Sequence, residues 1–469
     1  MIIRATQSDL DDFLALIEDL NELSALPITE MIALLKADES NLWTDIPVPG
    51  GGHVSVRQLS FKGFQRLADR LIGTQPRPFD FSREAVERKL REEFGRAFVG
   101  ARMMLTQDTA EAVLRAALAA ALDEHRSVRH FIPCVALSAT RPAEFRIGHV
   151  RFITRERFFS EHHQHFEEKR KYERSKAVEG WKRATDAGQF TVFESEEHAN
   201  EMGDTGVKWV TDFYSQHGWV AEILIPNCHP DRSEERAELA TQAALDVLKL
   251  LFGRYYSRHV RLGTSPALPE KTAGWKQVDE GRFEIHMSRQ GEDILVEDEW
   301  LSRAGSHERY YIRLAGLVIA GYVDPARRCD VGNRFLDALH WFGEAVSERL
   351  VSAATVKYAS ALERMTVTPD VGAQFTRTVV RRVSIVASAG DAELFEELAP
   401  VVRSLYTLRS EFMHGRRSPH DAAAGVSASY VVGRMLFRFL DLIRILARKG
   451  TVTDVDLAAE YRRLEALLN

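Results

Sequence analysis

From about residue 307 to the end of the chain, the sequence repeats one pattern of amphipathic helical segments joined by short loops. Apolar residues recur at helical spacing in segments near 307–323, 331–349, 354–366, 371–388, 391–414, 420–448 and 453–468. Helix-breaking residues mark most of the connections, at Asp324-Pro325, Thr368-Pro369, Gly390, Gly415 and Gly450. Because short loops make successive helices run side by side in opposite directions, this pattern predicts an all-α antiparallel bundle over residues 306–469.

The sequence before this bundle predicts a mixture of helices and strands. A chain of 469 residues exceeds what one hydrophobic core usually supports, so two or three domains are expected. Residues 1–127 are expected to be mostly helical, with a first helix capped by Ser8 and an alanine-rich helix over 108–125. Residues 128–305 are expected to form an α+β domain. The predicted fold class is therefore α+β, in which mixed α/β N-terminal and middle regions precede the all-α bundle.

Within the middle region, alternating apolar residues indicate strands. The expected strands are 129–138, 144–154, 219–226 and 282–288, with a turn at Arg141-Pro142 between the first two. A charged helix over 155–186 and an apolar helix over 233–256 are also expected. The glycine-rich stretch 47–56 is expected to be a plain connector, because no Lys-Ser/Thr follows its glycines as a phosphate-binding P-loop requires.

Charge and cysteine usage narrow the possible functions. The net charge of −6 argues against nonspecific coating of nucleic acid, so a nucleic-acid site would be a local basic patch. The three cysteines are far apart and form no CxxC pair, which argues against a thiolate zinc site and fits a reducing compartment: Cys134, Cys228 and Cys329. The chain starts without a secretion-signal pattern, and charged residues interrupt the apolar stretch 430–447. We therefore expect a cytoplasmic protein with no membrane partner, metal or cofactor.

Residues able to carry chemistry concentrate in the segment 402–415, VRSLYTLRSEFMHG. Its apolar positions recur at helical spacing and predict one face against the core. Four other residues fall largely outside that stripe, namely Tyr406, Arg409, Ser410 and His414. The two candidates for chemistry, Arg409 and His414, lie about 140° apart around a helix, so a long arginine side chain can close the gap between them.

The end of the same segment predicts a basic patch beside a histidine. Gly415 is the usual left-handed helix stop, which places His414 in the final turn. The window 403–417 holds four arginines and one glutamate, and besides Arg409 these arginines are the candidate RNA contacts Arg403, Arg416 and Arg417. A histidine that titrates near neutrality suits acid–base work on a phosphodiester. By spacing alone, a surface salt-bridge role for Arg409 and His414 is favoured.

The residues around this spacing resemble a known family. The segment Tyr-Thr-Leu-Arg-Ser-Glu-Phe-Met-His-Gly, 406–415, resembles the Tyr-x-x-Arg-Ser-x-x-x-His-Gly signature of the Apea-like HEPN family, which lies late in a helical bundle. Residues 335–346 (FLDALHWFGEAV), 361–365 (ALERM) and 378–385 (TVVRRVSI) are similar to the family's preceding helices, in the same order. Met365 stands where the family usually has leucine. The resemblance covers about 330–450.

The resemblance implies a metal-independent endoribonuclease. Arg409 would hold the scissile phosphate and stabilise its developing charge, while His414 moves protons as the 2′-hydroxyl of the RNA attacks. The products would carry a 2′,3′-cyclic phosphate and a 5′-hydroxyl. The supporting residues would be Ser410, Tyr406 and Glu363. Many family members carry Asn, Asp or His at the position of Ser410, which is a weaker polar group.

The resemblance also implies partners and a cellular role. Two copies of the motif helix would face each other, so the expected partners are RNA and a second copy of the chain in a homodimer. The expected role is anti-phage defence, as a toxin, or a stress response, in which the N-terminal region is regulatory and a phage or antitoxin partner is unidentified. Some HEPN domains are inactive, so the alternative is a non-catalytic RNA-binding or dimerisation scaffold.

Two charged helical stretches are weaker candidates. His162 and His165 share one helix face, but a solvated surface is favoured over metal binding. Residues 167–183 mix both charge signs with aromatic residues, and a salt-bridged helix is favoured over RNA contact.

Two further groups of polar residues interrupt apolar helices. A polar stripe on the helix 420–448 can line a cleft or face water, and consists of Arg434, Arg438 and Asp441. After His229-Pro230, Asp231 or Ser233 is expected to cap the following helix.

Overall fold

The computed structural model describes residues 3–27, 29–30, 44–138, 141–265, 271–279, 282–289, 300–372, 374–419, 425–450 and 452–467. The chain divides into two compact units. One comprises Met1–Val128 with Ile225–Arg236, and the other comprises Arg129–Leu224 with Ala237–Asn469. The second unit therefore holds both the middle strands and the helical bundle, and the boundaries predicted at residues 127 and 305 stay predictions.

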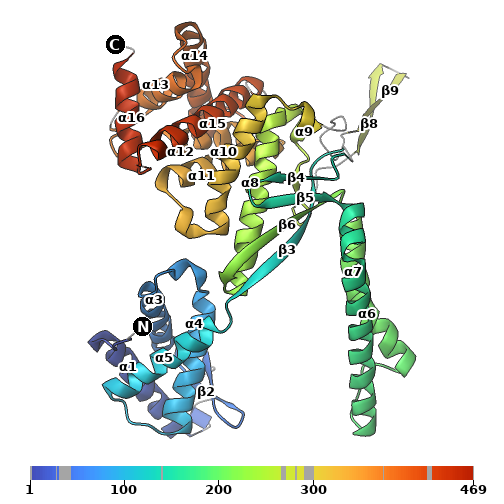
Figure 1. Cartoon of the computed structure of the whole chain (residues 1–469), viewed down its shortest axis with the longest axis vertical. Helices are drawn as coiled ribbons and strands as arrows, with labels where there is room; N and C mark the ends of the chain where they lie inside the picture. The colour runs from blue at the N-terminus through green and yellow to red at the C-terminus, as the bar shows by residue number, and fades with distance from the viewer. Residues whose placement is uncertain are drawn as a thin grey trace. The chain divides into compact units, whose positions relative to one another are not determined.

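Helices dominate the first unit (Figure 1). They enclose a core rich in aromatic side chains. Its elements are α1 (Gln7–Ala25), β1 (Thr44–Pro47), β2 (His53–Val56), α3 (Gln58–Gly73), α4 (Arg83–Phe94) and α5 (Gln107–Leu122). Phe13, Phe64 and Phe94 are fully buried. The rings of Phe64 and Phe94 meet edge to face with 5.3 Å between centroids, a geometry that adds about 0.5–1.5 kcal/mol to the free energy of burial.

Two local predictions in this unit are wrong. Helix α1 is capped by Thr6 rather than Ser8, because Asp9 completes a reciprocal capping box with Thr6 through side-chain and backbone hydrogen bonds. The stretch 47–56 is part of a β-hairpin rather than a plain connector, since β1 and β2 pair antiparallel. Its glycines, Gly50–Gly52, have φ values of 92°, 92° and 106° and turn the chain between the strands.

A five-stranded sheet lies in the middle of the chain. Its strands have the order β4 (Glu144–Ile147), β5 (Val150–Thr154), β6 (Trp219–Cys228), β3 (Arg126–Val135) and β7 (Arg261–Leu262). The single strand predicted over 144–154 is a hairpin, because Gly148 has φ +60° and reverses the chain between β4 and β5. A Cβ at Gly148 would lie 2.6 Å from the carbonyl oxygen of Gly316 in α10 (Ser306–Val323). The tip of this hairpin therefore packs backbone to backbone against a helix of the bundle.

Two helices that follow β5 pack side by side along their length (Figure 1). Helix α6 (Arg155–Asp186) has the range predicted from its charge pattern, and α7 (Glu196–Ser215) was not predicted. Backbone contact explains the pairing, because a Cβ at Gly203 would lie 2.8 Å from the Cα of Arg174. Further along, β8 (Lys271–Asp279) and β9 (Arg282–Arg289) form an antiparallel hairpin, which confirms the strand predicted over 282–288.

The C-terminal part is a helical bundle, drawn from yellow to red in Figure 1. After the short α9 (Trp300–Arg303) and α10, it contains α11 (Asp330–Ser347), α12 (Val351–Thr366), α13 (Phe375–Ser388), α14 (Ala392–Met413), α15 (Gly425–Arg448) and α16 (Asp454–Ala466). The expected α+β fold class, with a helical majority and an all-α C-terminal part, is confirmed. Residues 420–424 of the predicted helix 420–448 lie outside the described residues. Across the described ranges, no helix combines the length and apolarity needed to cross a bilayer.

Helix α8 (Pro230–Ser257) packs into the bundle through a buried ion pair. Asp246 and Lys249 are almost fully buried, and Lys249 Nζ lies 3.0 Å from Asp246 Oδ1. Lys249 Nζ also donates a hydrogen bond to the carbonyl oxygen of Gly343 in α11 at 3.2 Å. Burial raises the pKa of Asp246, against the opposing charge of Lys249. The hydrogen bond from Lys249 therefore joins this buried pair of α8 to the backbone of α11.

Candidate functional site

The C-terminal end of α14 presents His414 in a Schellman motif. Helix α14 ends at Met413, and His414 is the C-cap with φ −96° and ψ 9°. Gly415 has φ +67°, the left-handed conformation expected of the helix stop. The Gly415 N–H donates to the Phe412 carbonyl oxygen at 3.2 Å, and the Arg416 N–H donates to the Glu411 carbonyl oxygen at 2.8 Å. His414 therefore lies one residue beyond the last helical turn rather than within it, with its backbone held at both sides.

Arg409 lies one turn earlier on α14 and faces a carboxylate from α12. Its Nη2 is 3.7 Å from Glu363 Oε1, beyond hydrogen-bonding distance, and its side chain is 36% exposed. The Glu363 side chain is 23% exposed, and among the described residues its Oε1 atom has no hydrogen-bond partner. Burial raises the pKa of Glu363, and Arg409 and Tyr406 offset this only partly. The ion pair is therefore loose, and the guanidinium of Arg409 keeps donors free for an anion.

Tyr406, three residues before Arg409, joins α14 to α12. The ring is buried, and the Tyr406 hydroxyl donates to the carbonyl oxygen of Ala359 at 3.5 Å. Burial, the Glu363 charge and a hydrogen bond with Glu363 raise the pKa of Tyr406, against the opposing charge of Arg409. A phenol that stays neutral in this position can orient Glu363 but cannot act as a base. The structure thus brings together Glu363, Tyr406 and Arg409 from two helices.

The remaining predicted residues lie on the outer side of the helix end. Ser410 is half-buried, and its carbonyl oxygen accepts from the His414 N–H at 3.1 Å. The side chains of His414, Arg403 and Arg416 are exposed. Arg417 pairs with Glu411 at 3.5 Å and its guanidinium lies over the Phe412 ring. Among the described residues, no hydrogen bond or ion pair joins Arg409 with His414, so the two are neighbours on one helix end and not a locked pair.

The weaker candidates on α6 have structural roles. The His162 ring packs against Phe131 with 4.6 Å between centroids, and burial lowers the pKa of His162. In the part of the chain that the structure describes, no group of three or more His, Cys, Asp or Glu side chains is arranged to hold a metal ion. In the charged stretch 167–183, Arg174 pairs with Asp204 of α7 at 2.9 Å. The ion pairs of this stretch fit the salt-bridged helix that was favoured from the sequence.

The polar stripe on α15 makes contacts between helices of the bundle, and its Arg434 also lines a cavity between α8 and α15. Asp441 accepts hydrogen bonds from Tyr310 at 2.8 Å and Tyr311 at 2.9 Å, which joins α15 to α10. Arg438 pairs with Asp441 at 3.3 Å. Arg434 donates to the carbonyl oxygen of Ala387 at the end of α13. The stripe therefore connects helices within the bundle.

The prediction that Asp231 or Ser233 caps α8 is wrong. The residue before the helix, His229, is buried, and its Nδ1 accepts a hydrogen bond from the Asp231 N–H at 3.3 Å. His229 Nε2 lies 3.0 Å from Glu124 Oε2. His229 therefore caps the helix with its ring, and the carboxylate of Glu124 orients that ring.

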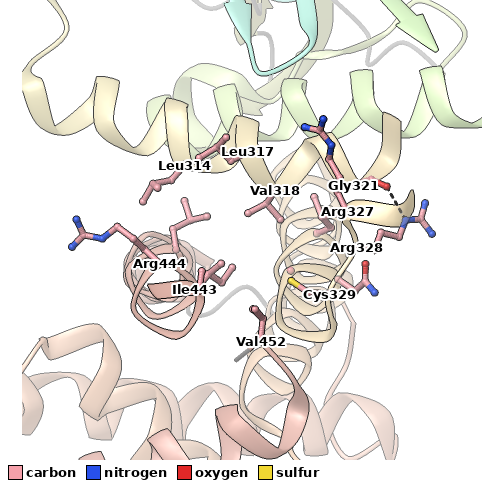
Figure 2. A pocket seen from close by; sticks show the side chains of 15 residues that line it. Leu314, Leu317, Val318, Gly321, Arg327, Arg328, Cys329, Ile443, Arg444 and Val452 are labelled. Atoms are coloured by element: carbon pink, nitrogen blue, oxygen red, sulfur yellow. Dashed lines mark hydrogen bonds between the residues drawn. The ribbon is translucent and has the colours of Figure 1, made fainter. Parts of the chain in front are cut away.

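Cavities lined by described residues lie elsewhere in the second unit. One of about 230 Å³ lies between α10, α11 and α15 and is lined mainly by aliphatic side chains (Figure 2). A second, of about 640 Å³, lies between α6 and α7. The third, of about 580 Å³, lies between the end of α8 and the first half of α15 and is lined by tyrosines and arginines. The sequence reasoning missed this third site, although residues 253–258, GRYYSR, follow the apolar part of α8 as a basic and aromatic run.

Comparisons of the chain with models of protein families, with curated proteins and with solved structures find no match.

Proposed function

We propose that the C-terminal bundle is an Apea-like HEPN domain and that the chain is a metal-independent endoribonuclease, with RNA as its substrate. The observation that carries the proposal is the end of α14. There a loosely paired arginine and an exposed histidine lie five residues apart at one helix end, and a Schellman motif holds the backbone of the histidine. Arg403, Arg416 and Arg417 add positive charge around it, as binding of a phosphate backbone requires.

The proposed reaction is an internal transesterification of RNA. The 2′-oxygen forms a bond to the adjacent phosphorus and the bond from phosphorus to the 5′-oxygen breaks. His414 takes the 2′-hydroxyl proton or donates a proton to the leaving 5′-oxygen. Arg409 stabilises the additional negative charge on the phosphoryl oxygens. The products are a 2′,3′-cyclic phosphate and a 5′-hydroxyl, with atoms and charge balanced without an added cofactor.

A second copy of α14 completes the proposed site. A single helix end that carries Arg409 and an exposed His414 contacts a strand from one side only. Two such ends facing each other would supply one group for each of the two proton transfers. We therefore propose a homodimer through the bundle. The N-terminal region would regulate it in defence or in a stress response, in answer to a phage component or an antitoxin.

One observation favours a second candidate, an RNA-binding or dimerisation scaffold. Glu363 places a half-buried carboxylate 3.7 Å from Arg409 and partly neutralises the group that would bind the scissile phosphate. In a scaffold, this pair would serve to hold α14 against α12. The two candidates differ in whether Arg409 contacts RNA during bond cleavage.

The test is cleavage of an end-labelled single-stranded RNA of mixed sequence by the full chain in EDTA. Arg409→Ala and His414→Ala are each expected to reduce the cleavage rate by about 10²-fold or more. Two exposed residues of the same types, Arg377 on α13 and His163 on α6, supply matched controls as Arg377→Ala and His163→Ala. The wild type and both controls are expected to produce cyclic-phosphate ends at the same rate.

Cleavage that survives Arg409→Ala and His414→Ala would refute the site. RNA binding by the wild type without cleavage, in a protein shown to be dimeric, would favour the scaffold.

A further inference from the structure

A groove of about 580 Å³ lies between the end of α8 and the first half of α15. It is lined by three arginines, by tyrosines of both helices and by apolar side chains at its floor, and we refer to it as the arginine–tyrosine groove. Its polar lining consists of Arg254, Tyr255, Tyr256, Arg258, Ser429, Tyr430 and Arg434. Its volume lies in the range of about 300–1,000 Å³ that small-molecule sites occupy in proteins.

The arginines of the groove have no carboxylate partner among the described residues. Arg254 donates to the carbonyl oxygen of Glu348 at 2.9 Å, and Arg434 donates to that of Ala387. The Nε atom of Arg258 is buried and has no hydrogen-bond partner in the part of the chain that the structure describes. Burial and the neighbouring charges of Arg254 and Arg349 lower the pKa of Arg258. Positive charges that repel one another and lack a counter-ion attract an anion, so an anionic ligand would be stabilised in this groove.

Aromatic rings stand beside these cations and are exposed to solvent. Tyr255 is 86% exposed, Tyr256 57% and Tyr430 55%. Single exposed aromatic side chains are common, whereas three gathered at one groove form a patch of the kind that marks binding sites. The guanidinium of Arg434 lies over the Tyr430 ring at 5.7 Å. The Tyr255 and Tyr256 rings meet edge to face with 4.9 Å between centroids, and both remain exposed to a stacking partner.

A kink at Gly253 turns the backbone of residues 254–258 away from the axis of α8. Gly253 has φ +73° and ψ 168°, a conformation that breaks α8 and that residues with a Cβ rarely adopt. The turn after it is held by the Ser257 hydroxyl, which donates to the carbonyl oxygen of Gly253 at 2.6 Å. The residues between them, 254–256, therefore leave the helix axis at a set angle.

The other two cavities do not offer the same chemistry. In the 230 Å³ cavity of Figure 2, the labelled Arg327, Arg328 and Arg444 point away from the space enclosed by the aliphatic side chains. In the α6–α7 cavity, Lys169 pairs with Glu173 at 2.5 Å, so one of its two lysines already has a carboxylate partner, and its lining includes no arginine.

We propose that the arginine–tyrosine groove binds a nucleotide unit, with the base stacked on Tyr255 or Tyr256 and the phosphate held by Arg254 and Arg258. Base stacking on aromatic rings combined with arginine contacts to phosphate is how proteins hold single-stranded nucleic acid. The source of the unit is either a free nucleotide or a single RNA strand. This inference goes beyond the proposed cleavage and does not depend on it, because it concerns binding at residues of α8 and α15.

The test measures binding of a short 5′-fluorescein single-stranded RNA to the full chain by fluorescence anisotropy, with AMP and inorganic phosphate as competitors. Tyr255→Ala is expected to weaken binding at least about fivefold, the effect of removing one stacked base. The double variant Arg254→Gln/Arg258→Gln is expected to flatten the dependence of log affinity on log salt by about 0.7 for each phosphate that is no longer neutralised. Because Tyr255 is exposed, its replacement leaves folding intact, which a thermal melt verifies.

Matched controls separate the groove from general surface charge and from the α14 site. Tyr172→Ala removes an exposed tyrosine from α6, and Arg377→Gln removes an exposed arginine from α13. Both are expected to bind the probe as the wild type does, and Tyr255→Phe is expected to restore binding. The fivefold loss of affinity on Tyr255→Ala is expected to persist in an Arg409→Ala background. The binding result can therefore be interpreted even if the cleavage proposal fails.

Competition by AMP would identify a free nucleotide as a sufficient ligand, whereas binding of the RNA without competition by AMP would identify a strand. The proposal is overturned if the Tyr255 and arginine variants bind as tightly as the wild type. It is also overturned if inorganic phosphate competes as well as AMP and Tyr255→Ala has no effect, since the groove would then hold an anion without a base.

Discussion

The side chains at the end of α14 differ in their burial and in the partners that they bind within the chain. Tyr406 is buried and interacts with Ala359 and Glu363. Arg409 is only loosely paired, because its distance of 3.7 Å to Glu363 is too long for a hydrogen bond. His414 is exposed, and in the part of the chain that the structure describes its hydrogen bonds are those of its backbone. A buried anchoring side chain followed by accessible ones along the same helix is what the proposed phosphate site would require, since its reacting residues must stay accessible.

A second residue-scale feature, Glu124, makes the stability of the first unit depend on pH. Burial opposes ionisation of Glu124, but hydrogen bonds from Lys89 and His229 and the charge of Arg88 outweigh it and lower its pKa from 4.5 to about 2. The folded pKa lies below the unfolded value, so this contribution to stability is present above the unfolded pKa and is lost as pH falls through about 2. We expect Glu124→Gln to lower the free energy of unfolding by about 1–2 kcal/mol near neutral pH, after allowance for solvent screening.

Urea unfolding of both proteins at a series of pH values checks this expectation. The difference between wild type and Glu124→Gln should shrink as pH falls below about 4.5. Glu18→Gln, which removes an exposed carboxylate from α1, controls for the change in net charge. A difference that stays constant down to acid pH would contradict the assigned ionisation.

At the scale of the element, the end of α14 depends on one glycine. Gly415 has φ +67°, and a side chain at a left-handed position costs about 1–2 kcal/mol. We expect Gly415→Ala to lower the free energy of unfolding by about 1 kcal/mol and to displace His414, with a larger relative loss of RNA cleavage than of stability. Thermal unfolding and cleavage rates measured on the same preparation provide the comparison.

The matched control for this change is Gly180→Ala, within the C-terminal half of α6. Nothing lies within 4 Å of a Cβ built there, and its φ is not in the left-handed range. Alanine favours a helix over glycine by about 0.5–1 kcal/mol, so this variant should be slightly more stable than the wild type with unchanged cleavage. Equal behaviour of the two glycine variants would show that the helix stop does not position His414.

At the scale of the whole molecule, the contact between α8 and α11 joins the middle of the chain to the bundle. A Cβ at Gly343 would overlap the carboxylate of Asp246, and both residues are buried. Because neither backbone nor buried carboxylate can yield easily, we expect Gly343→Ala to lower the free energy of unfolding by about 2–4 kcal/mol. If α8 and the bundle unfold as one cooperative unit, the whole transition of the second unit should move to lower denaturant concentration.

Denaturant titration followed by both far-UV circular dichroism and tryptophan fluorescence tests this expectation. Gly206→Ala on α7 is the control, since nothing lies within 4 Å of its Cβ position. An unchanged midpoint for Gly343→Ala would mean that α8 can shift on α11 and does not set its register.

Features that depend on near neighbours in the chain followed from the sequence alone. Amphipathic spacing predicted the bundle helices to within a few residues, because helical hydrogen bonds join residues four apart. The left-handed stop at Gly415 was predicted for the same reason, since a glycine stop depends only on the backbone of its own turn. Local patterns gave the wrong result where two nearby residues can both cap a helix, as Ser8 and Thr6 can. They also gave the wrong result where a glycine reverses the chain between two strands, as at Gly148.

The tertiary structure alone decided which distant side chains meet. The partner of Arg409 is Glu363 because α12 and α14 pack together, and no spacing within either helix indicates that pairing. The arginine–tyrosine groove likewise joins residues 254–258 to residues 429–437, which lie far apart along the chain. The physical reason is that a sequence encodes periodicity and caps locally, whereas the charge and burial of a site depend on which helices share a core.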